Sequence, residues 1–295
     1  MAETQSFVSF NSRLQELEGS IGRVLRGKPE VVRLSVVCLL ARGHLLIEDV
    51  PGVGKTTLAH ALARSVNCGF QRIQCTSDML PGDILGVTDE INRATPKTQS
   101  ALLEVMNERQ VSIDGRTLKM AEPFLVIATQ NPVEHHGTYP LPESQLDRFL
   151  MRLRIGYPDT ASEREIVRNH RSGMEASVTT VLSPEDLTGL QKAVEEVRVD
   201  EALVDYMLAI VEETRRHEGL SLGVSPRAAQ SLYRAAQALA ALEGREYVLP
   251  DDIKRLAGPV FAHRVVLQQR AALSARGGDA AERILDEILG RVEVP

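Results

Sequence analysis

Apolar residues in the first half of the chain follow two patterns, short unbroken runs and recurrences at every third or fourth position. Residues 45–47 and 124–128 are unbroken apolar runs, typical of parallel strands buried on both faces. The helical recurrences predict helices over about residues 7–42, 58–66 and 96–108, with a break at residues 27–29. Further strand candidates lie at residues 69–75 and 150–155, and an Asp-Gly turn predicts a hairpin over residues 110–119. The chain is therefore predicted to form a parallel sheet sandwiched by helices, an α/β fold.

The pattern changes after residue 158, where strand-like runs stop and amphipathic helices follow one another. Two of these helices begin with a serine followed by a proline, at Ser183 and Ser225, which is a strong signal for a first helical turn. We therefore predict two domains, an α/β nucleotide-binding domain over residues 1–158 and an all-helical domain over residues 159–295.

The most informative stretch lies between the first predicted strand and a predicted helix. It consists of Pro51, Gly52, Val53, Gly54, Lys55, Thr56 and Thr57. Small residues in such a loop let consecutive backbone N–H groups turn toward one anion, and the positive end of the helix dipole points the same way. Lys55 would reach the β- and γ-phosphates of a nucleotide, and the Thr56 hydroxyl would bind Mg²⁺. The stretch predicts a phosphate-binding loop.

One position departs from the common signature G-x-x-x-x-G-K-[ST], because Asp49 occupies the place of the first glycine. Aspartate tolerates unusual backbone angles better than most residues, so the turn remains feasible. The alternative is a glycine turn with a surface lysine, which the strand before and the helix after make much less attractive. Nucleotide binding is therefore the working hypothesis, with Asp49 counted among the nucleotide-binding residues.

A pair of acids, Asp89 and Glu90, lies 34 residues after Lys55 and follows a few apolar residues. Nucleotide hydrolysis needs one carboxylate to hold Mg²⁺ and another to orient and deprotonate the attacking water. We assign Asp89 to the metal and Glu90 to the water. On its own an Asp-Glu pair is a weak signal, and most such pairs lie on a solvated surface.

Two further polar residues lie near predicted strand ends. Asn131 follows the run at residues 124–128, and polar residues at the carboxyl ends of central strands face the ligand crevice of open α/β sheets. Asn131 is therefore a candidate to bond the γ-phosphate or the lytic water, although a turn former before Pro132 is an equal alternative. Arg148 is a fixed cation close to strand ends, and its alternative is a surface charge on a helix.

Composition narrows the function further. The chain has 34 Lys+Arg and 40 Asp+Glu, a net charge of −6, and no long basic run, which argues against nucleic acid as the main partner. Neither a membrane-spanning run nor a secretory signal is seen, so the chain is predicted to be cytoplasmic. The three cysteines include no C-x-x-C pair, so neither a disulfide framework nor a zinc site is indicated.

The stretch DEINRATPKTQSALLEVMNERQVSIDG, joined to VIATQNP, LPESQLDRF and GVSPRA, resembles the AAA+ ATPases and within them the MoxR family, over nearly the whole chain. The resemblance implies the AAA+ core of a P-loop NTPase with a C-terminal helical lid. It further implies that residues 51–57 are the Walker A loop, that Asp89 and Glu90 end Walker B, and that Asn131 is sensor 1. Residues 24–27, which end at Gly27, resemble the region that flanks adenine.

Two arginines take their roles from the same resemblance. Arg148 resembles the arginine finger that one subunit offers to the ATP of its neighbour. Arg227, at the start of a lid helix, resembles sensor 2, which would touch the γ-phosphate of its own subunit.

The resemblance implies an ATP hydrolase that uses ATP and Mg²⁺ and forms a homo-oligomer, a hexameric ring. It implies chaperone-like remodelling or maturation of client proteins, with a separate protein that carries a von Willebrand factor A domain. Two other classes remain open: a P-loop kinase for a small-molecule acceptor, and a nucleic-acid-dependent AAA+ motor. The helical lid with Arg227 argues against the kinase, and the pI of about 5.7 argues against the motor.

The chain departs from the family where PGDILGV runs directly into the acid pair, because relatives carry a longer segment there with a loop insertion and a full apolar strand. Either residues 84–87 form a shortened strand, or residues are missing at this point. The second interpretation is favoured, because a core strand beside the phosphate-loop strand is hard to dispense with.

Overall fold

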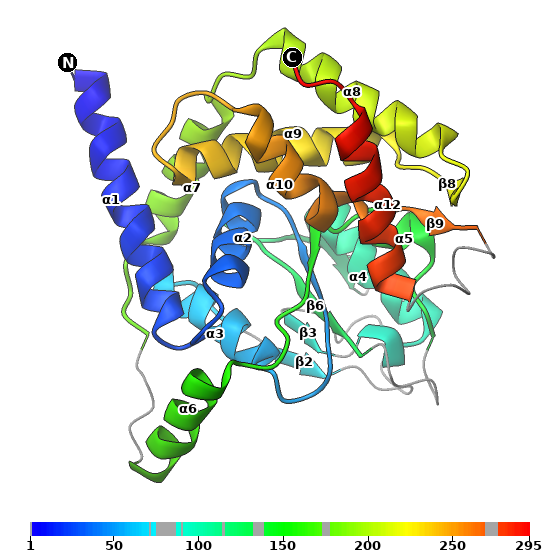
Figure 1. Ribbon diagram of the computed structural model, residues 1–295. Helices are drawn as coiled ribbons and strands as arrows, with labels where there is room; N and C mark the ends of the chain where they lie inside the picture. Colours follow the sequence, from blue (N-terminus) through cyan, green and yellow to red (C-terminus); the bar gives the residue numbers. More distant parts are fainter. Residues whose placement is uncertain are drawn as a thin grey trace.

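The computed structural model describes residues 2–70, 72–74, 87–89, 91–113, 116–131, 139–172, 178–268 and 277–295. A five-stranded sheet lies at its centre, in the order β2-β3-β6-β1-β7, and all of its strand pairs are parallel (Figure 1). Its strands are β1 (Leu45–Glu48), β2 (Arg72–Gln74), β3 (Val87–Asp89), β6 (Ile127–Gln130) and β7 (Met151–Leu153). A separate hairpin joins β4 (Gln110–Ile113) to β5 (Arg116–Lys119), as the Asp-Gly turn predicts.

The helices of the N-terminal half surround this sheet, the helices over residues 201–261 lie high in the view of Figure 1, and the helix over residues 160–172 lies low in it. They are α1 (Ala2–Gly22), α2 (Pro29–Leu40), α3 (Lys55–Ser65), the 3₁₀ turn η2 (Ile91–Arg93), α4 (Pro96–Glu108), α5 (Glu143–Leu146), α6 (Thr160–Ser172), α7 (Pro184–Glu195), α8 (Glu201–Arg216), α9 (Pro226–Leu242), α10 (Pro250–Phe261) and α12 (Gly277–Arg291). One short antiparallel pair, β8 (Leu220–Leu222) with β9 (Val266–Leu267), interrupts the helical half and was not expected from the sequence.

The central strands are buried on both faces, as their unbroken apolar runs predict. In β1, Leu45 and Ile47 belong to the large core that includes α1, α2 and α3, whereas Leu46 belongs to a second core that includes Leu102 and Leu103 of α4. Successive side chains of a strand point to opposite faces, so these two cores lie on the two sides of the sheet. The predicted fold class, a parallel sheet sandwiched by helices with a mostly helical C-terminal part, is confirmed.

Strand β6 begins three residues later than the apolar run at 124–128 predicts. The reason lies at His44, whose Nδ1 accepts the backbone N–H of Val126 at 3.0 Å. The ladder with β1 then begins at the next residue, with Ile127 opposite Leu45. Phe124 packs its ring edge-on against the His44 ring, at 5.7 Å between centroids.

Strand β3 shows how the short segment before the acid pair takes part in the sheet, and whether residues are missing there stays open. Val87–Asp89 lies between β2 and β6, paired with β2 at three positions and with β6 through Thr88 and Ala128. A strand of three residues therefore occupies the core position, and residues 84–86 lie outside the described part of the chain. The sheet is continuous, although this strand is shorter than the apolar strand that the resemblance leads us to expect.

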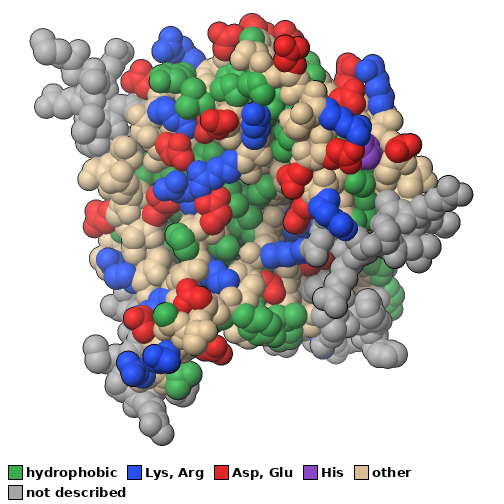
Figure 2. Space-filling model, in the orientation of Figure 1, with side chains coloured by type: hydrophobic (Ala, Val, Ile, Leu, Met, Phe, Trp, Pro, Cys, Tyr) green, Lys and Arg blue, Asp and Glu red, His purple; other side chains and the backbone are tan. Residues whose placement is uncertain are grey.

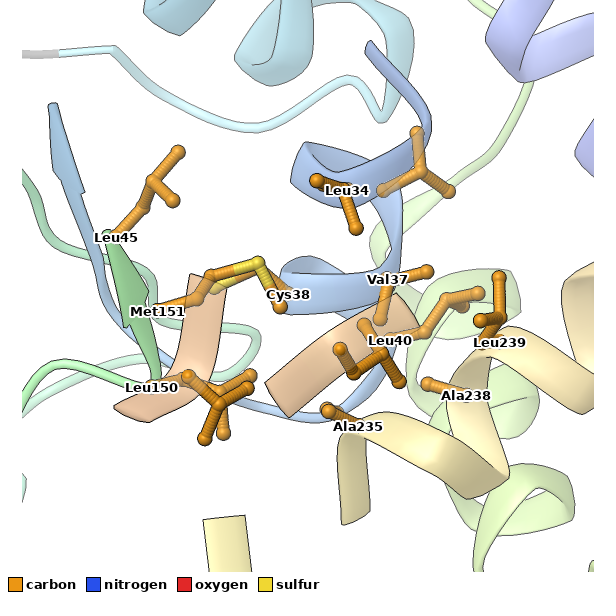
Figure 3. Close-up of a cluster of buried hydrophobic side chains, with 14 of the residues drawn as sticks. Leu34, Val37, Cys38, Leu40, Leu45, Leu150, Met151, Ala235, Ala238 and Leu239 are labelled. Carbon is orange, nitrogen blue, oxygen red and sulfur yellow. The ribbon is translucent and has the colours of Figure 1, made fainter. Parts of the chain in front are cut away.

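Helix α2 joins the sheet to the C-terminal helices (Figure 3). Cys38 lies near Leu45, Leu150 and Met151 of the sheet side, while Leu40 lies near α9. Cys38 is fully buried, and burial raises the pKa of its thiol, as expected of a small apolar core residue. Because one core runs from the sheet into the helical half, the boundary near residue 158 stays a prediction.

The face of the molecule in Figure 2 carries acidic and basic side chains interspersed among one another. This mixture agrees with the modest net charge of −6. In Figure 1, α6 projects from the body of the protein beside the lower end of α1.

Candidate functional site

The loop between β1 and α3 has the backbone of an anion site. Gly52 and Gly54 both have positive φ, 85° and 99°, a conformation that residues with a side chain rarely adopt. Gly54 is also the N-cap of α3, and it has no side chain with which to cap the helix. The first N–H groups of this 11-residue helix therefore point toward the loop together with the positive end of the helix dipole.

Lys55 is turned toward the carboxyl ends of the two central strands. Its Nζ donates to the carbonyl oxygen of Asp49, which follows β1, and to that of Gln130, which ends β6. The next residue, Thr56, is half-buried, whereas Thr57 and Pro51 are exposed. The structure thus places the lysine at the crevice where a parallel α/β sheet binds its ligand.

Asp49 has a role that the sequence did not indicate. Its carboxylate accepts the N–H of Val50 at 2.8 Å and the N–H of Gly156 at 2.6 Å. We expected an unusual backbone conformation here, but Asp49 is not among the described residues with positive φ. Its side chain instead ties the start of the loop to the chain that leaves β7, so a charged residue can replace the usual glycine.

Gly27 and the start of α6 pack together on the side of the loop where Asp49 contacts Gly156. Gly27 has φ of 71°, and a Cβ atom on it would lie 2.5 Å from Oγ of Ser162 and 3.1 Å from Oδ2 of Asp159. The Nζ of Lys28 donates to the carbonyl oxygen of Tyr157 at 2.7 Å. Residues 24–27 and 156–162 therefore lie together, beside the phosphate loop that Gly156 contacts through Asp49.

Two of the remaining predicted residues lie at the same edge of the sheet. Asp89 is the last residue of β3, and Asn131 directly follows β6, the strand that pairs with both β1 and β3. Asn131 is 5% exposed. The side chain of Asp89 and the whole of Glu90 lie outside the described residues. Lys55, Asp89 and Asn131 thus follow three neighbouring parallel strands at their carboxyl ends.

Arg148 and Arg227 lie at the opposite edge. Nη1 of Arg148 donates to the carbonyl oxygen of Leu103 in α4 at 3.0 Å, and Nη2 of Arg227 donates to Oδ1 of Asn107 at 3.2 Å. The two arginines line one cavity of about 180 Å³ together with Gly43 and His44, which precede β1. Figure 1 shows α3, which follows the phosphate loop, low in the view and α9 high.

That Arg227 touches the γ-phosphate of its own subunit stays a prediction, and in this structure Arg227 lies away from the phosphate loop. Arg227, in the first turn of α9, contacts Asn107 near the end of α4, at the amino ends of the strands, whereas the phosphate loop follows the carboxyl end of β1. The sequence shows that Arg227 starts a helix but not against which edge of the sheet that helix packs.

The cavity with Arg148 and Arg227 is lined by more basic than acidic side chains, with Asp147 as its one carboxylate among the described residues. Five arginines line it: Arg42, Arg109, Arg148, Arg227 and Arg234. Burial, and secondly the charge of Arg227, lower the pKa of Arg148; burial likewise lowers the pKa of Arg234. The buried Nε of Arg148 has no hydrogen-bond partner among the described residues. Such a cavity suits an anion, because each guanidinium offers planar donors that match phosphate oxygens.

Three of these arginines were missed in the sequence. Arg234 follows Arg227 by seven residues on α9, two helical turns, and this spacing would have placed both on one face. Nothing local marks Arg42 or Arg109, which reach the cavity from the end of α2 and the end of α4.

The edge with Lys55 fits a nucleotide with its metal. No group of three or more His, Cys, Asp or Glu side chains that could hold a metal occurs in the part of the chain that the structure describes. Mg²⁺ in nucleotide sites needs few protein ligands, because water and the phosphates supply the others. The roles of Thr56 and Asp89 as its ligands stay predictions. Among the described helices, none has the length and apolar character needed to cross a bilayer.

Comparison with known families agrees with this geometry. Residues 44–88 and 87–151 match the family described as "ATPase family associated with various cellular activities (AAA)". Residues 212–288 match the AAA lid domain. The first family matches in two pieces that meet at residues 87 and 88, at strand β3, where the sequence departs from its relatives.

Several proteins resemble the chain over nearly its whole length. YeaC of Bacillus subtilis is 46% identical over 299 positions, which cover 93% of this chain and 92% of YeaC. Chaperone MoxR1 of Mycobacterium tuberculosis is 41% identical, over 93% of this chain and 80% of MoxR1. The crystal structure of an ATPase candidate from Cytophaga hutchinsonii superposes with a TM-score of 0.92 at 34% identity, over 100% of this chain and 98% of that one.

The alignment with YeaC runs over 299 positions, more than the 295 residues of the whole chain, so YeaC has residues for which this chain has no counterpart. The matches to the AAA core, to the lid and to several MoxR proteins coincide with the elements that carry the site. The chain belongs to the MoxR family of AAA+ ATPases.

Proposed function

We propose that this protein hydrolyses ATP with Mg²⁺ in a ring built from copies of itself and uses the energy to remodel partner proteins. One observation carries the proposal. The phosphate loop lies at the carboxyl edge of the sheet, and two arginines suited to phosphate lie together at the amino edge. A single subunit therefore has two halves of an ATPase site that do not meet.

At the carboxyl edge, the N–H groups at the start of α3 and the ammonium of Lys55 bind the phosphates. The hydroxyl of Thr56 and the carboxylate of Asp89 hold Mg²⁺, which neutralises the charge that develops on the phosphates. Glu90 orients the attacking water, and Asn131, at the end of the neighbouring strand, bonds the water or the γ-phosphate. Asp49, Gly27 and Gly156 keep the rim of this site closed around the base.

At the amino edge, Arg148 and Arg227 serve the ATP of the neighbouring subunit. Contacts that join two different surfaces of identical subunits are head-to-tail, and such contacts close into a ring when the rotation between subunits allows. An arginine supplied in this way stabilises the charge of the transition state and typically contributes about 10³–10⁵ in rate. A hexamer is the ring that family membership suggests.

The proposed remodelling of partner proteins rests on family membership and not on particular residues of the site. The relative from Mycobacterium tuberculosis is named a chaperone. By the same family membership we propose that this chain matures or remodels a client protein in the cytoplasm, together with a separate protein that carries a von Willebrand factor A domain. Pull-down with the purified ring, loaded with ATP, would identify both.

Mixed assemblies test whether the site is shared. Lys55→Ala removes the phosphate-loop lysine but keeps both arginines, and Arg148→Ala keeps the phosphate loop but removes the finger. Each variant alone should hydrolyse ATP at least about 10³-fold more slowly than the unmodified protein. Mixed in equal amounts, they should recover turnover, because interfaces form that join an intact loop to an intact Arg148. If the mixture is as slow as its components, the shared site is wrong.

The same design decides which subunit Arg227 serves. A mixture of Arg227→Ala with Lys55→Ala recovers turnover if Arg227 acts on the neighbour, because the Lys55→Ala subunit supplies it. No recovery is expected if Arg227 acts within its own subunit, because the intact phosphate loops then all lack it. We expect recovery.

A further inference from the structure

Arg264, which follows α10, contacts the residues on both sides of Arg148 in the chain but not Arg148 itself. Its terminal nitrogens donate to four carbonyl oxygens, that of Val260 in α10 and those of Asp147 at 3.2 Å, Phe149 at 2.7 Å and Leu150 at 3.2 Å. Its Nε lies 2.9 Å from Oδ1 of Asp147. The residues on both sides of Arg148 are therefore held by one guanidinium.

Arg264 also contacts α9, the helix that carries Arg227. Its Nη2 donates to Oγ of Ser231 at 3.1 Å. A second tie runs through Ser225, the N-cap of α9, whose hydroxyl lies 3.0 Å from both carboxylate oxygens of Asp147. The neighbouring His263 adds a contact from its Nε2 to the carbonyl oxygen of Phe149 at 3.1 Å.

These contacts join the two parts of the molecule that the family comparison separates. Arg264 and Ser225 lie within the stretch that matches the lid, whereas Asp147, Phe149 and Leu150 lie within the stretch that matches the AAA core. The lid cannot turn away from this end of the core without breaking the contacts or carrying residues 147–150 with it.

Stability alone does not explain this cluster, because burying the charge of Arg264 is itself unfavourable. Arg264 is 4% exposed, and its burial lowers the pKa of the guanidinium to about 10, so the group is still a cation at neutral pH. Burying a charge costs several kcal/mol unless nearly all of its donors are satisfied, and apolar replacements often stabilise as well. What the contacts supply that apolar packing does not is a fixed direction for the backbone around Arg148.

We infer that Arg264 is a positioning residue that holds Arg148, in the core, and Arg227, in the lid, in one fixed arrangement, so that both arginines reach the neighbouring subunit's ATP together. The inference rests on the proposed function, because it assumes that these arginines act on the neighbour. It assigns the ties from Arg264 and Ser225 to Asp147 a regulatory role: lid orientation in one subunit sets the activity of the next.

The test measures ATP turnover in mixed rings, in which the subunit that supplies the arginines has an inactive phosphate loop of its own. Subunits with Arg148→Ala supply the phosphate loop, and Lys55→Ala subunits supply the arginines. Adding Arg264→Lys to the Lys55→Ala subunit should lower kcat of the mixture by about ten- to a hundredfold, since misplacement of a catalytic group by about 1 Å has that effect. KM for ATP should not change, because the loop-bearing subunits are unaltered.

Ser225 provides a variant that leaves the buried arginine in place. Ser225→Ala removes both a helix cap and the tie to Asp147, whereas Ser183→Ala removes a cap of the same kind on α7, where serine also precedes proline. In the Lys55→Ala background, Ser225→Ala should lower kcat of the mixture and Ser183→Ala should not. Ser225→Thr, which keeps the hydroxyl, should restore the rate.

Each outcome bears on one proposal. If the simple mixture of Lys55→Ala with Arg148→Ala has no activity, the shared site itself fails. If that mixture is active and the added Arg264→Lys and Ser225→Ala changes both leave kcat unchanged, the positioning role of Arg264 is overturned. Equal losses from Ser225→Ala and Ser183→Ala would also overturn it, because capping alone would then explain the effect.

Discussion

The Nζ atom of Lys55 lies 3.4 Å from the carbonyl oxygen of Gln130, the residue that precedes Asn131. The phosphate-loop lysine and the polar residue at the end of β6 are thus joined through one peptide unit. A phosphate that enters the loop would replace these contacts to neutral carbonyl oxygens with ion pairs, in which both the ammonium and the acceptor oxygens are charged. Binding of a nucleotide would therefore change the contact between Lys55 and the end of β6, next to Asn131.

Replacement of Lys55 by alanine should weaken ATP binding by about ten- to a hundredfold, because a hydrogen bond to a charged group contributes roughly 1.5–3 kcal/mol. Titration of a fluorescent ATP analogue into the purified variant measures this. The control is Lys192→Ala, which removes an exposed lysine on α7 and should leave the affinity as it was. Equal affinities for both variants would contradict the assigned role of Lys55.

The backbone at Gly54 leads to a second prediction. With φ of 99° and Leu25 Cδ1 only 3.1 Å from the place of a Cβ atom, Gly54→Ala should destabilise the protein by about 1–2 kcal/mol and weaken ATP binding. Gly189→Ala is the matched control, since that glycine lies inside α7 with open space around it. It should instead stabilise by about 0.5–1 kcal/mol. Urea unfolding of both variants measures the difference, and a stable, tightly binding Gly54→Ala would refute the strained loop.

Much of the carboxyl edge can be predicted from sequence because its signals are local. An apolar run indicates a parallel strand, the polar residues after it lie near the end of that strand, and parallel strands all end at one edge. Lys55, Asp89 and Asn131 are placed at that edge without knowledge of the strand order. The lysine, the helix start and the two glycines of the loop were likewise predicted from a single stretch of residues.

The amino edge could not be predicted in this way because its contacts join distant residues. Ser225 contacts Asp147 across 78 positions, and Arg264 contacts Phe149 across 115. No periodicity encodes such pairs. The same holds for Asp49, whose carboxylate finds Gly156 across 107 positions. The place of Arg227 likewise depends on a contact with Asn107, 120 positions away in the chain.

Glu90 directly follows Asp89 at the end of β3, so a third prediction addresses the water. Glu90→Gln keeps the size and polarity of the side chain but cannot accept a proton, so ATP should bind with unchanged affinity while turnover is lost. Steady-state phosphate release and ATP titration measure the two effects. Glu196→Gln, at the exposed end of α7, is a control that should change neither. Normal turnover in Glu90→Gln would remove Glu90 from the mechanism.

The Glu90→Gln protein is also the tool for finding a client. A ring that binds ATP without hydrolysing it should hold its partners longer than the unmodified ring does. Proteins that co-purify with Glu90→Gln from the native host in ATP, but not with Lys55→Ala, are candidates for the client and for a von Willebrand factor A partner. If the two variants retain the same proteins, retention does not depend on bound ATP.

Acid should destabilise the protein through His44, whose burial lowers the pKa of its imidazole from 6.5 to about 4. Nδ1 accepts the N–H of Val126 and Nε2 contacts the carbonyl oxygen of Met106, so a second proton would break the first bond. Between about pH 6.5 and 4 the unfolded chain binds a proton that the folded chain does not, so stability is full above this window and falls as the pH falls through it. The loss from this group should reach about 2 kcal/mol at pH 5. Urea unfolding at pH 7 and pH 5 measures it.

His44→Asn, which keeps an acceptor for Val126, should start less stable at pH 7 but lose less on acidification. The His44→Asn protein should still lose some stability on acidification, because His263 is also buried and burial lowers the pKa of its imidazole. An equal loss in the parent and in His44→Asn would show that His44 is not the acid-sensitive group.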